Sequence, residues 1–241
     1  MFGREEINRS RLNWMWHVVL PAAAFLLSFI WIQATDFDIR LADAVFYDWH
    51  AHRWMGADTW WAVDLIHTGG SIFVRIVALG AAALIIAGSV SLRWRPWRRG
   101  ALYVFLGIAL STGTVGLLKQ ITDRDCPWDL AHYGGNRPYI PVFAHRADDL
   151  PRAACFPGAH SSSGFSLLCF YFLMRDRSAR AAKWMLLAAL LTGSLFSLGQ
   201  QARGAHFLSH DLTSAAIVWF VLLGLYLVMR DRSLVRSLSW Q

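Results

Sequence analysis

Six apolar stretches recur along the chain, separated by short segments that are mostly basic or mixed polar and aromatic. A helix needs about 20 mostly apolar residues to cross the hydrocarbon core of a bilayer. The candidates are residues 13–33, 71–91, 100–119, 160–174, 184–202 and 211–229. The sequence therefore predicts an all-α, polytopic membrane protein with six transmembrane helices. The fourth stretch is short and begins with polar residues, so we expect its first turn to lie against protein rather than lipid.

Composition narrows the class of protein further. Only 16% of the 241 residues are charged, whereas a soluble domain usually has about 25%. The formal net charge is +7, but the basic residues form short groups between apolar stretches instead of one binding face, so we expect no nucleic-acid partner. The first apolar stretch is too long for a secretory signal and lacks a clear cleavage site. We expect residues 1–241 to form a single membrane-embedded domain in contact with the lipid bilayer.

The basic groups also predict the orientation of the chain. They lie at both termini and in the second-to-third and fourth-to-fifth connections, and their members are Arg4, Arg9, Arg11, Arg93, Arg95, Arg98, Arg99, Arg175, Arg177, Arg180, Lys183, Arg230, Arg232 and Arg236. With six spans, all four groups fall on one side, and basic loops mark the cytoplasmic side. We therefore expect cytoplasmic termini and an opposite side formed by residues 34–70, 120–159 and 203–210. The first of these segments, rich in Trp and Asp, predicts one or two amphipathic helices at the membrane interface.

Ionisable residues from three distant segments are expected to meet on that opposite side. They are Lys119, Arg124, His160, Arg203, His206, His210 and Asp211. Ionisable groups at membrane depth are costly and indicate function. Lys and Arg bind phosphate oxygens, free amides at a helix start favour an anion, and two histidines supply a nucleophile and a general acid. The combination favours phosphoryl transfer, and it requires no metal ion or cofactor.

In order, spacing and sidedness, these segments resemble the three motifs of the type-2 phosphatidic acid phosphatase superfamily, K-x6-R-P, P-S-G-H and S-R-x5-H-x3-D. The resemblance covers about residues 70–230 and implies a six-helix phosphatase core. The third segment is similar to a subgroup of bacterial lipid phosphatases with the sequence R-G-A-H-F-x-S-H.

The first motif is only partly kept. Lys119 matches its lysine and Pro127 its proline, but Cys126 stands at the position of its arginine. Arg124, two residues earlier, is the expected substitute and is predicted to bind phosphate.

The second motif keeps its proline and histidine at residues 157–160 but lacks the serine that would bind phosphate. Ser161 or Ser162 is expected to replace that serine. Gly158 and Ala159 are expected to supply the helix start that faces the phosphate.

The third motif departs at two positions. The alignment puts His206 at the nucleophile and His210 at the orienting aspartate, with Asp211 beside it as the alternative. Gln200 stands at the arginine position, so Arg203, almost one helical turn later, is the expected phosphate ligand.

A mechanism follows from the resemblance. His206 would attack phosphorus and form a phosphohistidine, and His160 would protonate the leaving oxygen and later activate water. Lys119, Arg124 and Arg203 would balance the charge of the phosphoryl oxygens. The implied protein is a lipid phosphatase of a bacterial inner membrane whose site faces the periplasm. Undecaprenyl pyrophosphate, phosphatidylglycerol phosphate, phosphatidic acid and lipid A are candidate substrates.

Two of the three cysteines flank the motifs. Cys126 and Cys155 both lie in the non-cytoplasmic segment, where an oxidising compartment favours a disulfide. Such a bridge would tie the first motif to the start of the fourth helix; two free thiols or a metal site with nearby histidines are the alternatives. Cys169 is expected to be a buried apolar residue.

Other functions remain open at this stage. A relative of the same fold could pass the phosphoryl group to a second lipid, and no residue separates transfer from hydrolysis. A non-enzymatic protein could bind haem, or zinc through His206, His210 and Asp211. A transporter has little support, because the chain shows no internal duplication. The histidines without a motif are expected to be structural; they are His17, His50, His52 and His67.

Overall fold

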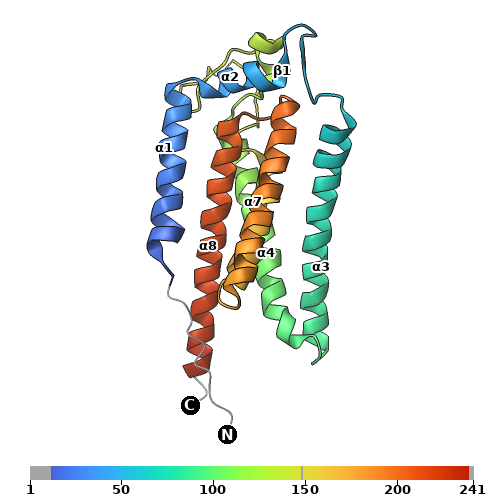
Figure 1. The fold of residues 1–241 in the computed structure, drawn as a ribbon, viewed down its shortest axis with the longest axis vertical. Helices are drawn as coiled ribbons and strands as arrows, with labels where there is room; N and C mark the ends of the chain where they lie inside the picture. The colour runs from blue at the N-terminus through green and yellow to red at the C-terminus, as the bar shows by residue number, and fades with distance from the viewer. Residues whose placement is uncertain (1–11, 148, 239–241) are drawn as a thin grey trace.

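Long helices follow the apolar stretches and lie side by side along one axis (Figure 1). The computed structural model describes residues 12–147 and 149–238, so the N-terminal basic group lies outside the described residues. The long helices are α1 (Leu20–Ala34), which continues the π-helical turn η1 (Met15–Val19), α3 (Gly70–Val90), α4 (Arg95–Thr122), α7 (Ala179–Ala202) and α8 (Leu208–Leu238). Within the described residues, five helices are long and apolar enough to cross a membrane. The all-α, multi-pass membrane fold is confirmed.

The fourth predicted stretch is a run of short helical pieces in the centre of the bundle. It consists of α5 (Ala159–Phe165), η6 (Ser166–Leu168) and α6 (Cys169–Met174). It packs against α4, α7 and α8, and Leu168, Cys169 and Phe172 are almost fully buried. The hydroxyls of Ser161 and Ser162 each donate to a carbonyl three residues earlier. The polar first turn therefore lies against protein, as expected, and its hydroxyl donors are satisfied locally.

The second span begins earlier than the sequence predicts. The π-helix η3 (Trp61–Gly69) passes straight into α3, because Gly69 and Gly70 both keep right-handed helical dihedrals. One continuous helix therefore runs over Trp61–Val90. The predicted boundary at residue 71 was wrong, and His67 lies within this helix instead of in an interfacial loop.

One end of the bundle, which we call the capped end, is covered by the connections between helices. They contain α2 (Phe37–Leu41), the π-helix η2 (Ala42–Phe46) and the antiparallel pair β1 (Tyr47–Asp48) and β2 (Arg53–Trp54), in which Tyr47 faces Trp54. The short 3-10 turns η4 (Pro127–Asp129) and η5 (Ala131–Tyr133) complete the cover. The rings of Trp54 and Tyr133 pack 4.5 Å apart in a small aromatic core that also contains Phe207.

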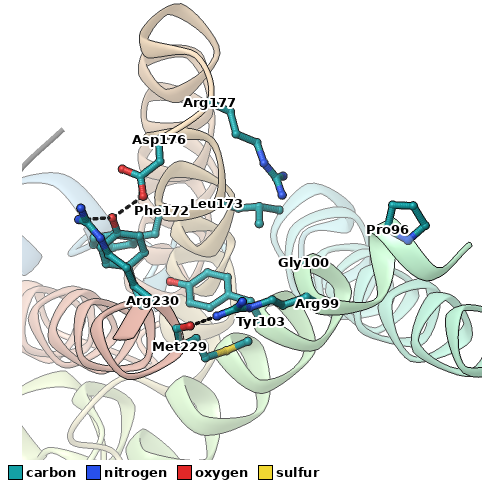
Figure 2. A pocket seen from close by; sticks show the side chains of 11 residues that line it. Pro96, Arg99, Gly100, Tyr103, Phe172, Leu173, Asp176, Arg177, Met229 and Arg230 are labelled. Carbon is teal, nitrogen blue, oxygen red and sulfur yellow. Dashed lines mark hydrogen bonds between the residues drawn. The ribbon is translucent and has the colours of Figure 1, made fainter. Parts of the chain in front are cut away.

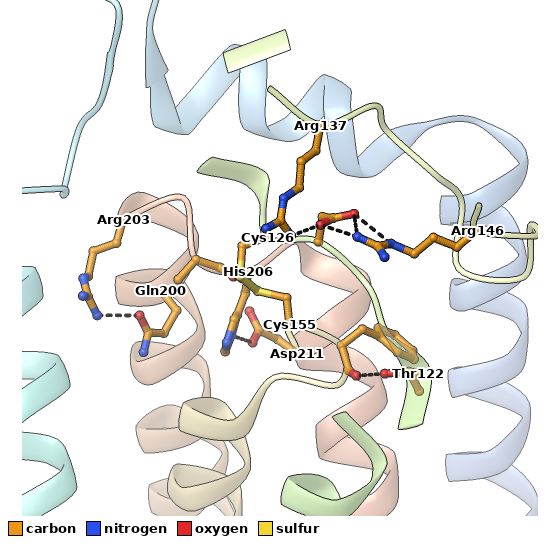
Figure 3. Close-up of a disulfide and its surroundings, with 12 residues drawn as sticks. Thr122, Cys126, Arg137, Arg146, Cys155, Gln200, Arg203, His206 and Asp211 are labelled. Carbon is orange, nitrogen blue, oxygen red and sulfur yellow. Dashed lines mark hydrogen bonds and ion pairs between the residues drawn. A yellow bond between two sulfur atoms is a disulfide. The ribbon is translucent and has the colours of Figure 1, made fainter. Parts of the chain in front are cut away.

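Charged residues fasten this cover to the bundle. Arg146 donates to both carboxylate oxygens of Asp125 at 3.0 Å, and Arg137 pairs with the same carboxylate (Figure 3). Asp38 of α2 accepts a hydrogen bond from the backbone amide of Ser209 in the first turn of α8, at 3.0 Å. Burial raises the pKa of the Asp38 carboxyl above its ordinary value. These contacts hold the segment after α4 and the start of α8 in place.

The other end, which we call the basic end, gathers the described basic groups. The α3–α4 and α6–α7 connections and the far end of α8 lie there (Figure 1). A cavity of about 310 Å³ at this end is lined by Arg99, Arg177 and Arg230 (Figure 2). Arg99 donates to the carbonyl of Met229, and Tyr226 donates to Asp176 at 2.6 Å. The described basic groups thus share one end, as the orientation argument requires.

Candidate active site

The three predicted segments meet around one cavity at the capped end. The cavity has a volume of about 310 Å³ and is lined by residues from η3, the end of α4, the start of α5 and the α7–α8 connection. The lining includes Lys119, Ala159, His160, Arg203 and His206, and it also includes His67, Trp128, Gln200 and both Cys126 and Cys155. Residues more than 80 positions apart in the sequence therefore share one chamber.

His206 and Asp211 form the most closely coupled pair in this chamber. Nδ1 of His206 lies 2.7 Å from Oδ1 of Asp211, and the two residues are 6% and 2% exposed (Figure 3). The second carboxylate oxygen accepts a hydrogen bond from Nε2 of Gln201 at 2.9 Å. A carboxylate bonded to Nδ1 keeps the proton on that nitrogen and leaves the Nε2 lone pair available. The pair therefore has the geometry of a nucleophilic imidazole held by a buried carboxylate.

His210 does not hold His206, contrary to the alignment. Its ring centroid is 6.2 Å from that of His206, and it packs edge-on against Phe156 and Phe207. Because α8 begins only at Leu208, His206 precedes the helix, and the residue that reaches it is five positions later rather than four. The carbonyl of His210 accepts a hydrogen bond from the amide of Gly158 at 3.1 Å. His210 thus positions the turn before α5.

Two predicted phosphate ligands in that turn already have their donors in use. The amide of Gly158 donates to His210, and the hydroxyl of Ser161 donates to the carbonyl of Gly158 at 3.0 Å. Neither residue is among those that line the chamber. Gly158 is needed for a different reason: a Cβ there would lie 2.7 Å from Asp211 Oδ1, His206 Nδ1 and Ser161 Oγ. Only a residue without a side chain lets the turn approach the His206–Asp211 pair so closely.

His160, in the first turn of α5, also lines the chamber. Its ring stacks on Phe196 with centroids 4.6 Å apart and an interplanar angle of 18°. Its two ring nitrogens lie 3.3 Å from the carbonyl of Ile66 and 3.4 Å from the hydroxyl of Ser71. Hydrogen bonds of this length are weak, so a ring nitrogen of His160 can exchange one of them for a hydrogen bond to a substrate oxygen.

A relay of hydrogen bonds joins Arg203 to a histidine that the sequence analysis set aside. Arg203 donates through Nη1 to Oε1 of Gln200 at 2.8 Å, and Nε2 of Gln200 lies 2.8 Å from Nδ1 of His67. Because an arginine only donates, Gln200 must accept from it and donate to His67, so the proton of a neutral His67 is on Nε2. Burial lowers the pKa of the Arg203 guanidinium, which nevertheless stays charged at neutral pH.

His67 was therefore missed as a residue of the site. No motif marks it, and its placement depends on the helix that begins at Trp61. The available signal was its spacing from Ser71: residues four positions apart lie on the same face of a helix.

Arg124, in contrast, does not line the chamber. Its guanidinium donates to the carbonyls of Val142 and Ala144 at 3.0 and 2.6 Å, so it fastens the long connection before α5. The chain turns at Asp123, whose φ of 50° is left-handed, and this turn takes Arg124 out of the line of α4. The structure thus gives no support to Arg124 as a phosphate ligand. Lys119 and Arg203 are the lysine and arginine of the lining.

The predicted disulfide joins Cys126 to Cys155, with Cα atoms 5.2 Å apart (Figure 3). It links the segment after α4 to the segment before α5, and both cysteines line the chamber. Cys169 is a free, buried thiol, as expected. Among the described residues, no group of three or more His, Cys, Asp or Glu is arranged to hold a metal ion.

Reduction of this disulfide is expected to lower stability markedly. The bridge spans 29 positions, and closing a loop of that size stabilises a fold by roughly 3–4 kcal/mol. Thermal unfolding in detergent should therefore show a lower midpoint after treatment with a reductant. The double variant Cys126→Ala/Cys155→Ala is the control, because its midpoint should already be low and unresponsive. A wild-type midpoint that stays constant after complete reduction would contradict the expectation.

Comparison with known proteins gives one match. A sequence model of the PAP2 superfamily matches residues 100–234, which run from within α4 into α8. The match includes all three predicted segments and every residue that lines the chamber except His67. Searches of curated proteins and of solved structures returned no match.

Proposed function

This chain belongs to the PAP2 superfamily, a family of phosphatases, and we propose that it releases phosphate from a membrane lipid through a phosphohistidine on His206. The observation that carries the proposal is the buried contact between His206 Nδ1 and Asp211 in a chamber with two cations. A buried carboxylate on one ring nitrogen makes the other a nucleophile at neutral pH. Lys119 and Arg203 can stabilise the negative charge on the oxygens of the phosphoryl group during its transfer.

The reaction then has two steps. Nε2 of His206 attacks phosphorus, the bond from phosphorus to the leaving oxygen breaks, and His160 gives that oxygen a proton. His160 next takes a proton from water, which attacks the phosphohistidine and frees inorganic phosphate and His206. Lys119 and Arg203 hold the equatorial oxygens in both steps, and His67, linked to Arg203 through Gln200, forms the remaining wall. The route uses side chains of the protein throughout.

Lipids are the proposed substrates because the chamber opens at the end of membrane-length helices. A phosphate headgroup can occupy the chamber while its tail stays among the helices. The candidates are undecaprenyl pyrophosphate, phosphatidylglycerol phosphate, phosphatidic acid and lipid A. The chamber lies at the end opposite the described basic groups, which favours the periplasmic face of a bacterial inner membrane with cytoplasmic termini.

Phosphate release by the purified, detergent-solubilised chain tests this function. The substrates are the four candidate lipids, each assayed with and without EDTA. We expect release from at least one lipid at a rate that EDTA does not change. Transfer of labelled phosphate to a second lipid without release would indicate a phosphotransferase instead. Neither release nor transfer from any of the four lipids would contradict the proposal.

Substitution Gly158→Ala is expected to lower kcat/KM by at least about 100-fold, because displacement of reacting groups by an ångström has that effect. The added methyl would press on both His206 and Asp211. Gly113→Ala is the matched control, since a Cβ at Gly113 meets nothing within 4 Å. Equal activity of the two variants would show that the close approach at Gly158 does not matter for the reaction.

A further inference from the structure

A second cavity adjoins the catalytic chamber at His160 and is not lined by His206. It has a volume of about 370 Å³ and shares His67, Ala159 and His160 with the catalytic chamber. Its other walls come from α3, α4 and α5 and include Ser71, Arg75, Thr112 and Ser163. The lining is mixed, and its polar side chains have no obvious use in packing, because each polar group within membrane-spanning segments costs free energy unless it has a partner.

Arg75 is the cation of this cavity. It lies five residues into α3, which places its Cα roughly 7 Å along the helix from Gly70. An arginine at such a depth is costly and usually marks a binding function. Arg75 lies one helical turn after Ser71; both residues line the cavity, and Arg75 is exposed. No described residue forms a hydrogen bond or ion pair with Arg75 among the contacts of the structure.

The neighbouring polar groups cannot neutralise it. Thr112 and Ser163 donate their hydroxyl protons to carbonyls of their own helices at 2.8 and 2.7 Å. The lining contains no Asp or Glu. The ring of His67, held through Nδ1 by Gln200, carries its proton on Nε2 when neutral. The cavity therefore offers one full positive charge and no negative charge, which is the chemistry of an anion site.

Its position relative to the catalytic chamber identifies the anion. His206 lines only the first chamber, whereas His160, the proposed general acid, lines both cavities, and an in-line displacement sends the leaving group away from the nucleophile. The leaving group therefore lies on the side of His160, where the second cavity begins. Further along the same helices, an apolar cavity of about 680 Å³ is lined by Val77, Ala81 and Val104. Along α3 the order is thus phosphate chamber, anion site, apolar space.

We propose that the second cavity binds the inner phosphate of a lipid diphosphate, with Arg75 as its ligand. The inference rests on the proposed function and narrows its substrate class. His206 attacks the outer phosphorus, the bond from that phosphorus to the bridging oxygen breaks, and the electron pair leaves on the lipid monophosphate. Arg75 balances the additional negative charge on that product, and water then releases the outer phosphate from His206.

Matched substrates test the inference: farnesyl diphosphate and farnesyl monophosphate, which share one tail. The wild type should prefer the diphosphate by more than about tenfold in kcat/KM, because a hydrogen bond to a charged group is worth that much or more. Arg75→Gln should lower kcat/KM for the diphosphate by about 10- to 100-fold and change that for the monophosphate less than about twofold. Arg75→Lys should keep part of the preference. Arg95→Gln, at the basic end, is the control for loss of one positive charge.

Three outcomes would overturn the inference: no preference in the wild type, equal loss on both substrates, or no loss in Arg75→Gln. Binding of a non-hydrolysable farnesyl methylenediphosphonate separates this inference from the proposed function. If the wild type hydrolyses nothing yet binds the analogue more than about tenfold tighter than Arg75→Gln does, the result supports the anion site and contradicts the proposed phosphatase activity. If hydrolysis occurs and the wild type and Arg75→Gln bind the analogue equally well, the result supports the phosphatase activity and contradicts the anion site.

Discussion

His206→Ala is expected to reduce phosphate release by about 10⁴-fold or more, the usual effect of removing a nucleophile that forms a covalent intermediate. The imidazole is the only group of the chamber that a buried carboxylate holds through one nitrogen among the described residues. Removing it takes away the atom that bonds to phosphorus, which neither Lys119 nor Arg203 can replace. Release of labelled phosphate from the preferred lipid measures the effect.

Two further observations make this test specific. Brief exposure to labelled substrate followed by quenching in alkali should leave label on the wild-type protein and none on His206→Ala. His132→Ala is the matched control, because His132 contacts Asp43 on the surface and does not line the chamber. The same thermal midpoint in both variants would exclude misfolding as the cause. A labelled and active His206→Ala protein would disprove the phosphohistidine.

Asp211→Asn is expected to reduce kcat by about 10³- to 10⁴-fold, because an amide at this position no longer favours the reactive imidazole tautomer. The Asn side chain is nearly the same size as that of Asp, and Gln201 can still donate to its oxygen. His210→Phe should cost less than about tenfold, since the His210 ring packs among aromatic rings and its contact to Gly158 uses the backbone.

These two variants distinguish the geometry from the alignment. If the residue four positions after His206 oriented it, as the family pattern indicates, His210→Phe would lose about 10³- to 10⁴-fold of the activity and Asp211→Asn would lose little.

Much of the fold could be predicted because the apolar stretches allow few alternatives. A run of about 20 apolar residues can satisfy its backbone in lipid only as a helix, so five long helices follow from the sequence. The start of the second span could not be predicted, because Gly69 and Gly70 read as a helix end but remain helical within the bundle. The short fourth span depends on packing against α4, α7 and α8.

The motifs predicted part of the site. The residues whose position depends on the exact start or end of a helix could not be predicted. Lys119, His160, Arg203 and His206 meet as expected. The sequence left the partner of His206 open between His210 and Asp211. The structure shows the contact with Asp211, because α8 starts after His206, which the alignment does not show. Arg124 is removed from the site by the left-handed turn at Asp123. Spacing along the sequence carries no information on either point.

The continuous helix over Trp61–Val90 has 30 residues and is therefore about 45 Å long, which exceeds a hydrocarbon core of about 30 Å. Such a helix meets a thinner or thicker membrane by tilting. His67 and Arg75 both belong to it, whereas His160 belongs to the interior of the bundle. We therefore expect the acyl-chain length of the surrounding bilayer to affect how this helix tilts, and with it the wall that carries His67 and Arg75.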